Sequence, residues 1–279
     1  MQATIDQLFV YPVKGCRGVA VERATLAVTG LELDGIGDRE WVVVGEDGEF
    51  LSQRELPQMA LIETRLTSSA LRLKAPEMLQ LEVPFASEGE VINVRVWDDS
   101  VAAVTQGEVA DAWLSRYLER PCRLMRFDPE GKRLSNARYT GATEAPYKFA
   151  DAFALLVAST ASLAALNARL ERRGAAAVGM ERFRPNLVLS GVEAYEEDYV
   201  DRLVLGDARL RVVKPCVRCS VPNVDPATGV PSTEPGDTLA LYRDNQRAGG
   251  VTFGVNAIVE AGAGLEIARG VPLEISLAV

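Results

Sequence analysis

Short stretches of alternating apolar and polar residues dominate the first hundred positions of the chain. This period of two is typical of half-buried β-strands, and a turn-forming Gly-Glu-Asp-Gly sequence at 45–48 favours a β-hairpin. Evenly spaced short strands of this kind predict a sheet closed into a barrel or a sandwich. The stretches that show the pattern are residues 5–13, 18–28, 39–55, 61–75 and 92–107.

Helical periodicity first appears in residues 107–122, where apolar residues recur three and four positions apart until Pro121 ends the pattern. The polar residues 126–148, with their glycines and proline, predict a loop that connects two domains. Because a single hydrophobic core stops growing at about this chain length, we expect two domains, residues 1–122 and 123–279.

The second half of the chain mixes strands with one clear helix. Residues 151–159 have the pattern of a buried strand, and a helix is predicted from Ser159 or Thr160 as N-cap to Gly174 at its C-terminal end. Further strands are predicted from residue 186, as a hairpin over 201–213 that continues into Lys214-Pro215-Cys216, and over 252–260 and 271–278. The whole pattern predicts a mainly β protein with some α-helix.

Composition and charge narrow the functional classes. The chain has 30 basic and 39 acidic residues, a net charge of −9, which argues against a nucleic-acid-binding protein because that function needs a basic face. No apolar run reaches the roughly 18 residues of a membrane span, and the N-terminus lacks the pattern of a secretory signal. We therefore expect a cytoplasmic protein with no membrane segment and with reduced cysteines. The sequence has no histidine. This excludes catalytic units that use histidine, and it excludes zinc sites that have histidine among their ligands.

Cys216 and Cys219 form a CxxC pair in the segment KPCVRCSVPNVDPATG. Three interpretations are open at this point. In the first, the two thiols are small apolar side chains that fill space. In the second, they join Cys16 and Cys122 in a four-thiolate zinc site, for which a second CxxC pair is missing. The third is a single reactive or metal-ligating thiolate, which the flanking lysine and arginine favour, and which suits a metal that brings most of its own ligands.

Basic side chains stand at predicted strand ends in both halves of the chain. Lys14 and Arg17 lie in a glycine-flanked loop, Arg39 follows an aspartate, and Arg182 and Arg184 directly precede a strand. Each of them alone is typical of a solvated surface charge. Together, in an acidic protein, they indicate a pocket between the two domains for an anionic ligand, with phosphate as the favoured group.

These segments resemble the MOSC family, proteins related to the C-terminal domain of molybdenum-cofactor sulfurase. The likeness is strongest to two-part members such as the mitochondrial amidoxime-reducing component and bacterial reductases of N-hydroxylated bases. YPVKGCRGVAV and LELDGIGDREWVVVGEDGEFLSQRE resemble the N-terminal part, whereas STASLAALN, RFRPNLVLSG, LVLGDARLRVVKPCVRCSVPNVDPATG and FGVN resemble the MOSC domain. The resemblance implies an α+β, mainly β fold, in which a MOSC-type β-barrel domain is preceded by a smaller N-terminal β-barrel domain.

The resemblance also implies a cofactor and a set of site residues. Cys219 is expected to be the catalytic residue and the one protein ligand of molybdenum, which arrives bound to molybdopterin, whereas Cys216 is not expected to bind the metal. Ala152 and Phe153 stand where the mitochondrial relative has a Thr-Ser pair, so only the backbone of these two residues is expected to contact the cofactor. The cofactor-binding positions implied are Lys14, Gly15, Arg39, Ala152, Phe153, Arg184, Asn186, Val217, Arg218 and Asn256.

The function that the resemblance implies is a molybdenum-cofactor-dependent reductase of N-hydroxylated or N-oxygenated small molecules. The membrane anchor and the ferredoxin domain of some relatives are expected to be missing here. Electrons are therefore expected from a separate protein, of ferredoxin or flavin-reductase type. Two alternatives stay open: a sulfur-carrier or cofactor-handling protein that bears a persulfide on Cys219, and a protein of this fold that binds nothing.

Overall fold

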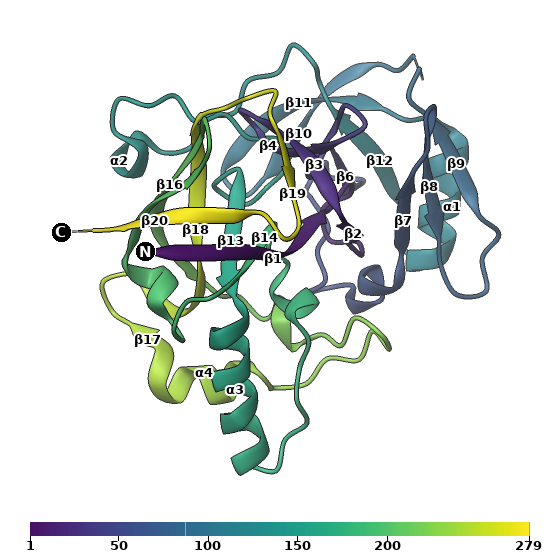
Figure 1. Ribbon diagram of the computed structural model, residues 1–279. Helices are drawn as coiled ribbons and strands as arrows, with labels where there is room; N and C mark the ends of the chain where they lie inside the picture. Colours follow the sequence, from purple (N-terminus) through teal and green to yellow (C-terminus); the bar gives the residue numbers. More distant parts are fainter. Residues whose placement is uncertain (87, 279) are drawn as a thin grey trace.

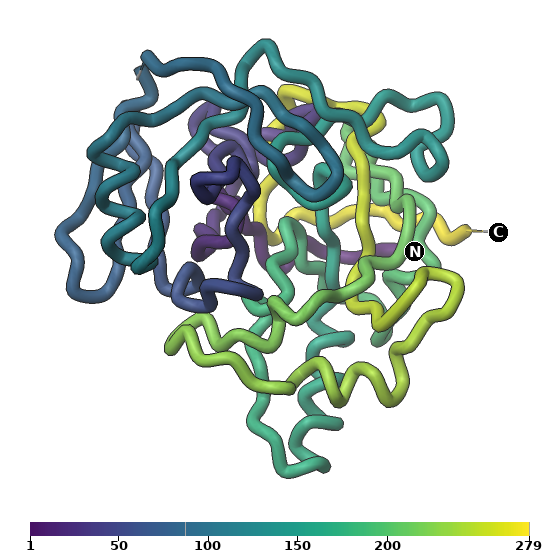
Figure 2. Tube along the Cα trace, turned by 180° about the vertical axis from the view of Figure 1, so that it is seen from behind, coloured from purple at the N-terminus to yellow at the C-terminus, as the bar shows by residue number. Residues whose placement is uncertain are grey.

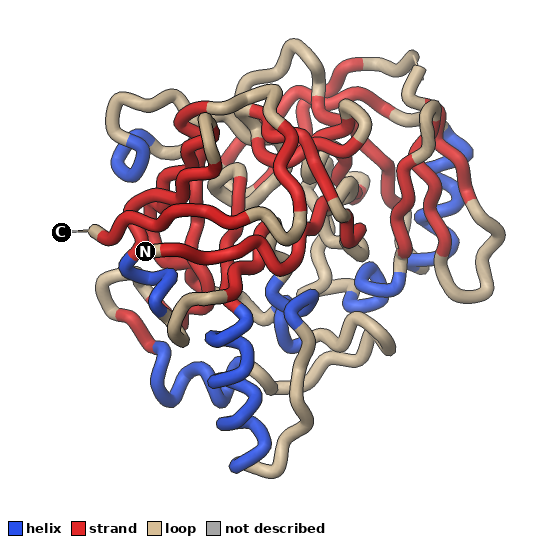
Figure 3. The backbone as a smooth tube through the Cα atoms, in the orientation of Figure 1, coloured by secondary structure: helices blue, strands red, loops and turns tan. Residues whose placement is uncertain are grey.

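Strands form the centre of the molecule and helices lie at its outer edges (Figure 1, Figure 3). The computed structural model describes residues 1–86 and 88–278. No helix within these two ranges is both long and apolar enough to cross a membrane. The mainly β architecture with a few helices confirms the fold class that the sequence predicts.

Seven strands close into a barrel in the order β13-β14-β1-β20-β15-β16-β18, and a further pairing of β13 with β18 completes the ring. The neighbours β13 and β14 run parallel, whereas the other pairs of the ring are antiparallel. The barrel is built mostly from the second half of the chain, but its third strand is the N-terminal one. The seven strands are β1 (Gln2–Val10), β13 (Leu155–Ser159), β14 (Leu187–Ser190), β15 (Val200–Leu205), β16 (Ala208–Val217), β18 (Gly250–Ala261) and β20 (Pro272–Leu277).

Three smaller sheets pack beside the barrel, the first near the middle of Figure 1 and the third at its right. The first contains β19 (Glu266–Ala268), β3 (Arg23–Ala27), β4 (Gly30–Leu33) and β5 (Ile36–Gly37). The second contains β10 (Val91–Val96), β11 (Asp99–Thr105), β12 (Cys122–Phe127) and β6 (Trp41–Gly45). The third contains β7 (Glu63–Leu66), β8 (Ala70–Lys74) and β9 (Leu81–Pro84), while the short strands β2 (Val19–Val21) and β17 (Asp244–Asn245) pair with β1 and β18.

The described residues contain four α-helices: α1 (Glu108–Leu118), α2 (Ala137–Thr140), α3 (Thr160–Arg172) and α4 (Gly236–Arg243). The predicted N-cap of α3 is confirmed, because the Ser159 hydroxyl accepts a hydrogen bond from the backbone N–H of Ser162 at 3.1 Å. Leu166 and Leu170 are the apolar residues that this helix buries against the barrel, and Gly174 follows it with a left-handed φ of 76°. Single-turn helical segments occupy Pro57–Leu61, Met180–Phe183, Glu196–Tyr199 and Val221–Asn223.

Some predicted elements differ from the observed ones. The second strand expected within residues 39–55 is reduced to isolated bridges at Glu49 and Phe50, because the chain leaves the sheet there to form a pocket wall. The predicted loop over residues 126–148 was wrong in part, since β12 reaches Phe127 and the short α2 lies within it. The polar helix α4 has no clear apolar stripe in the sequence and was not predicted.

The two halves of the chain share their packing. Ile5 and Leu8 of β1 and Leu26 of β3 belong to the same buried cluster as Val157 and Leu187 of the second half. The division expected at 122/123 falls at the first residue of β12, a strand that pairs with β6. The boundary itself stays a prediction. What matters for the site is that loops from both halves meet at one end of the barrel.

Candidate functional site

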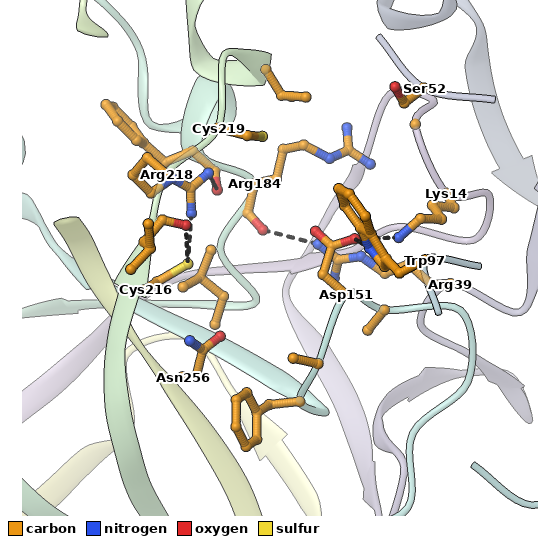
Figure 4. A pocket seen from close by; sticks show the side chains of 18 of the residues that line it. Lys14, Arg39, Ser52, Trp97, Asp151, Arg184, Cys216, Arg218, Cys219 and Asn256 are labelled. Carbon is orange, nitrogen blue, oxygen red and sulfur yellow. Dashed lines mark hydrogen bonds and ion pairs between the residues drawn. The ribbon is translucent and has the colours of Figure 1, made fainter. Parts of the chain in front are cut away.

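A cavity of about 220 Å³ lies where the two halves of the chain meet, and Figure 4 shows the side chains that surround it. Cys216, Arg218 and Cys219 lie on one side of it, Lys14, Trp97 and Asp151 lie on the other, and Arg184 stands between the two groups. A second cavity of about 310 Å³ adjoins it, since both are lined by Gln53, Arg184 and Val221. Arg17 and Arg182, also named from the sequence, line the second cavity. The first cavity brings together the metal- and cofactor-binding positions that the resemblance implies: Lys14, Gly15, Arg39, Ala152, Phe153, Arg184, Asn186, Val217, Arg218, Cys219 and Asn256.

The thiol side of the cavity is formed where β16 ends. A register shift between Pro215 and Val217 lies near the end of β16, where Val217 still pairs with Thr252 of β18, and Cys219 lies just beyond the strand with an exposed side chain. Arg218 folds back: it donates to the Cys216 Sγ at 3.1 Å and to the Phe183 carbonyl at 2.9 Å. Cys216 is therefore half-buried under a guanidinium, whereas Cys219 is the thiol that faces open space.

The other two cysteines lie in different surroundings from Cys216 and Cys219. Cys16 and Cys122 are both buried in the core of the N-terminal half, and desolvation raises the pKa of the Cys16 thiol to about 12. In the described part of the chain, no three Cys, His, Asp or Glu side chains are grouped so that they could bind a metal ion. The four-thiolate interpretation is therefore wrong, and the two CxxC cysteines stand apart from Cys16 and Cys122.

The loop that follows Cys219 is tied to both halves of the protein. Arg182 pairs with the Asp225 carboxylate at 3.2 Å, and Arg17 donates to the Pro226 carbonyl at 2.5 Å. Asp225 also organises its own turn by accepting from the Ala227 N–H at 2.8 Å. Figure 2 shows this yellow-green loop beside the dark-blue 51–62 segment. These contacts fix the position from which the Cys219 thiol is presented.

Lys14 forms the opposite end of the cavity. Its ammonium donates to the Phe149 carbonyl at 2.9 Å and to Asp151 Oδ1 at 2.5 Å, and the residue is only 8% exposed. The same carboxylate oxygen accepts from the Trp97 indole N–H at 3.1 Å. Burial lowers the pKa of the Lys14 ammonium below its ordinary value, and the negative charge of Asp151 opposes that shift.

Two buried guanidinium groups flank one aromatic ring in the wall of the cavity. Arg39 and Arg184 lie 4.3 and 4.4 Å from the centre of the Tyr11 ring. Arg39 pairs with Asp38, and it also donates to the Arg184 carbonyl at 3.1 Å. Arg184 donates to the Cys16 carbonyl at 2.6 Å. Burial lowers the pKa of the Arg184 guanidinium, and the nearby charge of Arg39 lowers it further, so this pair of cations is short of negative charge.

The remaining expected positions contribute mainly backbone and shape. Gly15 has a left-handed φ of 83°, and a Cβ added there would lie 2.9 Å from the Met59 methyl group, so the backbone needs glycine at this point. Ala152 is exposed, with its carbonyl accepting from Ser135 at 2.8 Å, and Phe153 is buried. Their apolar side chains agree with the expectation that only the backbone here can contact a polar ligand. Val217 and Asn256 line the cavity from β16 and β18.

Several cavity residues have no signal in the sequence pattern. Trp97 occupies a hairpin turn with a φ of 58°, a conformation in which a bulky residue is uncommon, and its ring packs on Phe50 and Arg54. Asp151 begins a stretch that reads only as a buried strand. The left-handed conformation of Trp97 can be recognised only from the backbone of the structure, so sequence reasoning missed Trp97 and Asp151 as cavity residues.

The charge of the cavity is unbalanced. Among the described residues that line it, six are cationic and one, Asp151, is acidic. In a chain with a net charge of −9, such a concentration of positive charge favours an anionic ligand. The six cations are Lys14, Arg39, Arg54, Arg184, Lys214 and Arg218.

A two-part fold with a closed barrel, a CxxC at the end of a barrel strand and a cationic cavity between the halves matches one class of protein. Residues 2–121 match the MOSC N-terminal beta barrel domain, and residues 144–273 match the MOSC domain. The chain belongs to the MOSC family, which confirms the resemblance seen in its sequence.

Relatives among curated proteins include mitochondrial amidoxime-reducing components. The chain is 34% identical over 246 residues to mitochondrial amidoxime reducing component 2 of Bos taurus, an alignment that covers 86% of this chain and 72% of the relative. It is 35% identical over 246 residues to component 1 of Mus musculus, covering 86% and 71%, and 35% identical over 246 residues to component 1 of Homo sapiens, covering 86% and 72%.

Proposed function

We propose that this protein is a molybdenum-cofactor-dependent reductase of N-hydroxylated compounds. The observation that carries the proposal is the exposed Cys219 thiol in a cavity that six cationic side chains line together with apolar ones. The names of its relatives, amidoxime-reducing components, support the substrate class. The proposal includes a small N-oxygenated substrate and a separate electron-transfer protein of ferredoxin or flavin type as partners.

The residues of the cavity fit such a cofactor. A single soft thiolate suits a metal that arrives with sulfur ligands of its own, and Cys219 is the exposed thiol available for it. The Arg184 Nη2 and the Arg218 Nε are buried and have no hydrogen-bond acceptor within the described chain. Guanidinium groups with unsatisfied donors fit an anionic ligand that carries phosphate.

When bound, the cofactor supplies the two-electron chemistry that removes the oxygen of an N–OH group. The chain supplies binding and electrostatics. Cys219 would hold the metal; Lys14, Arg39 and Arg184 would bind the anionic part of the cofactor. Asn186 and Gly15 keep these groups in place, since Asn186 accepts from Arg39 at 3.2 Å and the Gly15 carbonyl accepts from Gln53 at 2.6 Å.

Metal analysis of two matched cysteine variants tests the metal ligand. Protein made in a molybdate-replete host is expected to contain about one molybdenum and one pterin per chain, as a single thiolate site requires. Cys219→Ser should lose the metal, whereas the neighbouring Cys216→Ser should keep it. Retention of molybdenum by Cys219→Ser would refute the ligand assignment.

Reduction of an aromatic amidoxime with a chemically reduced viologen as electron donor tests the activity. The wild type and Cys216→Ser are expected to form the amidine, and Cys219→Ser is not. A sulfur carrier would instead show a mass increase of roughly 32 Da on Cys219, one sulfur atom that a thiol reductant removes, with no turnover of the amidoxime. That pair of results would favour the carrier function over the reductase.

A further inference from the structure

The Lys14–Asp151 contact is asymmetric in its exposure. The side chain of Lys14 is 10% exposed, whereas that of Asp151 is 70% exposed in the mouth of the cavity. A buried ammonium needs a counter-ion, because an unpaired buried charge costs several kcal/mol. An exposed carboxylate can leave for water at little cost. If an anion enters the cavity, the group that it can replace is therefore Asp151, and the group that stays is Lys14.

The hydrogen bonds of Asp151 hold it in this counter-ion position. Its Oδ1 accepts from both Lys14 and the Trp97 indole, and Trp97 is itself fixed by Phe50, whose ring centre lies 5.0 Å away, and by Arg54 at 4.4 Å. Trp97 is 42% exposed. The carboxylate thus has two donors on one oxygen, and its side chain is 70% exposed. Figure 4 shows it beside Lys14 and Trp97.

Asp151 also has the wrong charge for the cavity. It is the one acidic side chain among the described lining residues, and it stands against the cation that is furthest from the thiol side. An anionic ligand that contacts Lys14 would be repelled by Asp151 if the carboxylate kept its place. Lys14 has three N–H donors and uses two of them within the protein.

We propose that Asp151 is an exchangeable counter-ion that determines how strongly the Lys14 end of the cavity binds a phosphate-bearing ligand. In the ligand-free protein, Asp151 neutralises Lys14 and accepts from Trp97. On binding, the phosphate oxygens replace the carboxylate on Lys14, and Asp151 and Trp97 separate. The ligand affinity is thereby reduced by the strength of the internal ion pair, so weakly charged anions do not occupy the site. This inference rests on the anionic ligand of the proposed function, but not on the metal or the reduction.

Pyrophosphate titration of the cofactor-free full-length chain tests the exchange. Asp151→Asn keeps an acceptor for Trp97 but removes the charge, so it should bind pyrophosphate roughly tenfold more tightly, which corresponds to about 1.4 kcal/mol. Without ligand, the variant should melt at a lower temperature than the wild type, because Lys14 has lost its counter-ion. Saturating pyrophosphate should close that gap, because binding stabilises the variant more.

A matched control removes a carboxylate from an exposed pair outside the cavity. Lys132 and Glu144 pair at 3.0 Å with both side chains more than half exposed, so Glu144→Gln should change neither the pyrophosphate affinity nor the melting temperature. Unchanged or weaker pyrophosphate binding by Asp151→Asn would overturn the proposal. So would a loss of stability that persists at saturation, which is what a purely structural role of Asp151 predicts.

A second measurement uses the wild type and does not depend on the folding of a variant. The chain has three tryptophans, so protein labelled with 5-fluorotryptophan should give three ¹⁹F resonances, of which Trp97→Phe identifies one. The Trp97 resonance should shift on pyrophosphate binding, while that of buried Trp41 should not. A Trp97 signal that stays fixed at saturation would refute the exchange. Because no metal is present, this result is independent of whether Cys219 binds molybdenum.

Discussion

Asn186→Ala should destabilise the protein substantially even when no ligand is bound. The side chain is 1% exposed, and it joins three segments that are far apart in the sequence. Its Oδ1 accepts from the Leu156 N–H at 3.1 Å and from Arg39 at 3.2 Å, and its Nδ2 donates to the Phe9 carbonyl at 3.2 Å. Alanine would remove all three bonds at once and leave their partly buried partners without them.

The size of the loss follows from those partners. The Leu156 N–H and the Phe9 carbonyl lose a side-chain partner at partly buried positions, at about 1–2 kcal/mol each. Arg39 keeps its contacts with Asp38 and the Arg184 carbonyl, so its share is smaller. The expected total is about 2–4 kcal/mol, which a domain of ordinary stability survives.

Urea denaturation of cofactor-free protein measures this loss. The control is Asn93→Ala, because Asn93 is exposed on β10 and its substitution should change the free energy of unfolding by less than about 0.5 kcal/mol. A loss below about 1 kcal/mol for Asn186→Ala would show that the residue does not join the two halves. In that case its role would be confined to the ligand.

Two further predictions concern backbone shape and pH. Gly15→Ala should lower the free energy of unfolding by about 1–3 kcal/mol, measured by urea denaturation, because residues with a Cβ rarely adopt its φ of 83° and because the Met59 methyl group, 2.9 Å from the new Cβ, would have to shift. A neutral effect would contradict this reasoning. Burial raises the pKa of the Glu197 carboxyl, so the folded protein loses stability as pH rises above the unfolded pKa of 4.5. The free energy of unfolding of Glu197→Gln should therefore increase relative to that of the wild type as pH rises, and urea denaturation at several pH values measures this. A difference that does not change with pH would refute the prediction.

The elements that depend on local pattern could be predicted, and those that depend on distant partners could not. The α3 helix has its own cap at Ser159 and its own apolar stripe, so the sequence contains everything that defines it. The strand β12 was missed because its alternation is weak and its partner, β6, lies about eighty residues earlier. The closure of the barrel by β1 also depends on pairings with β14 and β20, which no local pattern specifies.

The site shows the same division. Resemblance to a family located Lys14, Arg39 and Cys219, and the structure places them around one cavity. It could not locate Asp151 or Trp97, because their importance comes from a hydrogen bond between residues 54 positions apart. The separate environments of Cys216 and Cys219 were likewise invisible in the CxxC spacing, since they arise from the way Arg218 folds over Cys216.

Backbone strain gives an independent reason to regard this cavity as functional. Of the seven described non-glycine residues with a left-handed φ, three line it: Arg39, Trp97 and Arg184, with φ angles between 49° and 58°. Glycine or asparagine adopts this conformation at lower cost, so we expect the contacts of the arginine and tryptophan side chains to offset the backbone strain. For Arg184, the contacts of the side chain with the described residues are few: it stacks on Tyr11 and donates one hydrogen bond, while its Nη2 has no acceptor among these residues. Its strained, buried charge is best explained by a ligand that brings the missing negative charge.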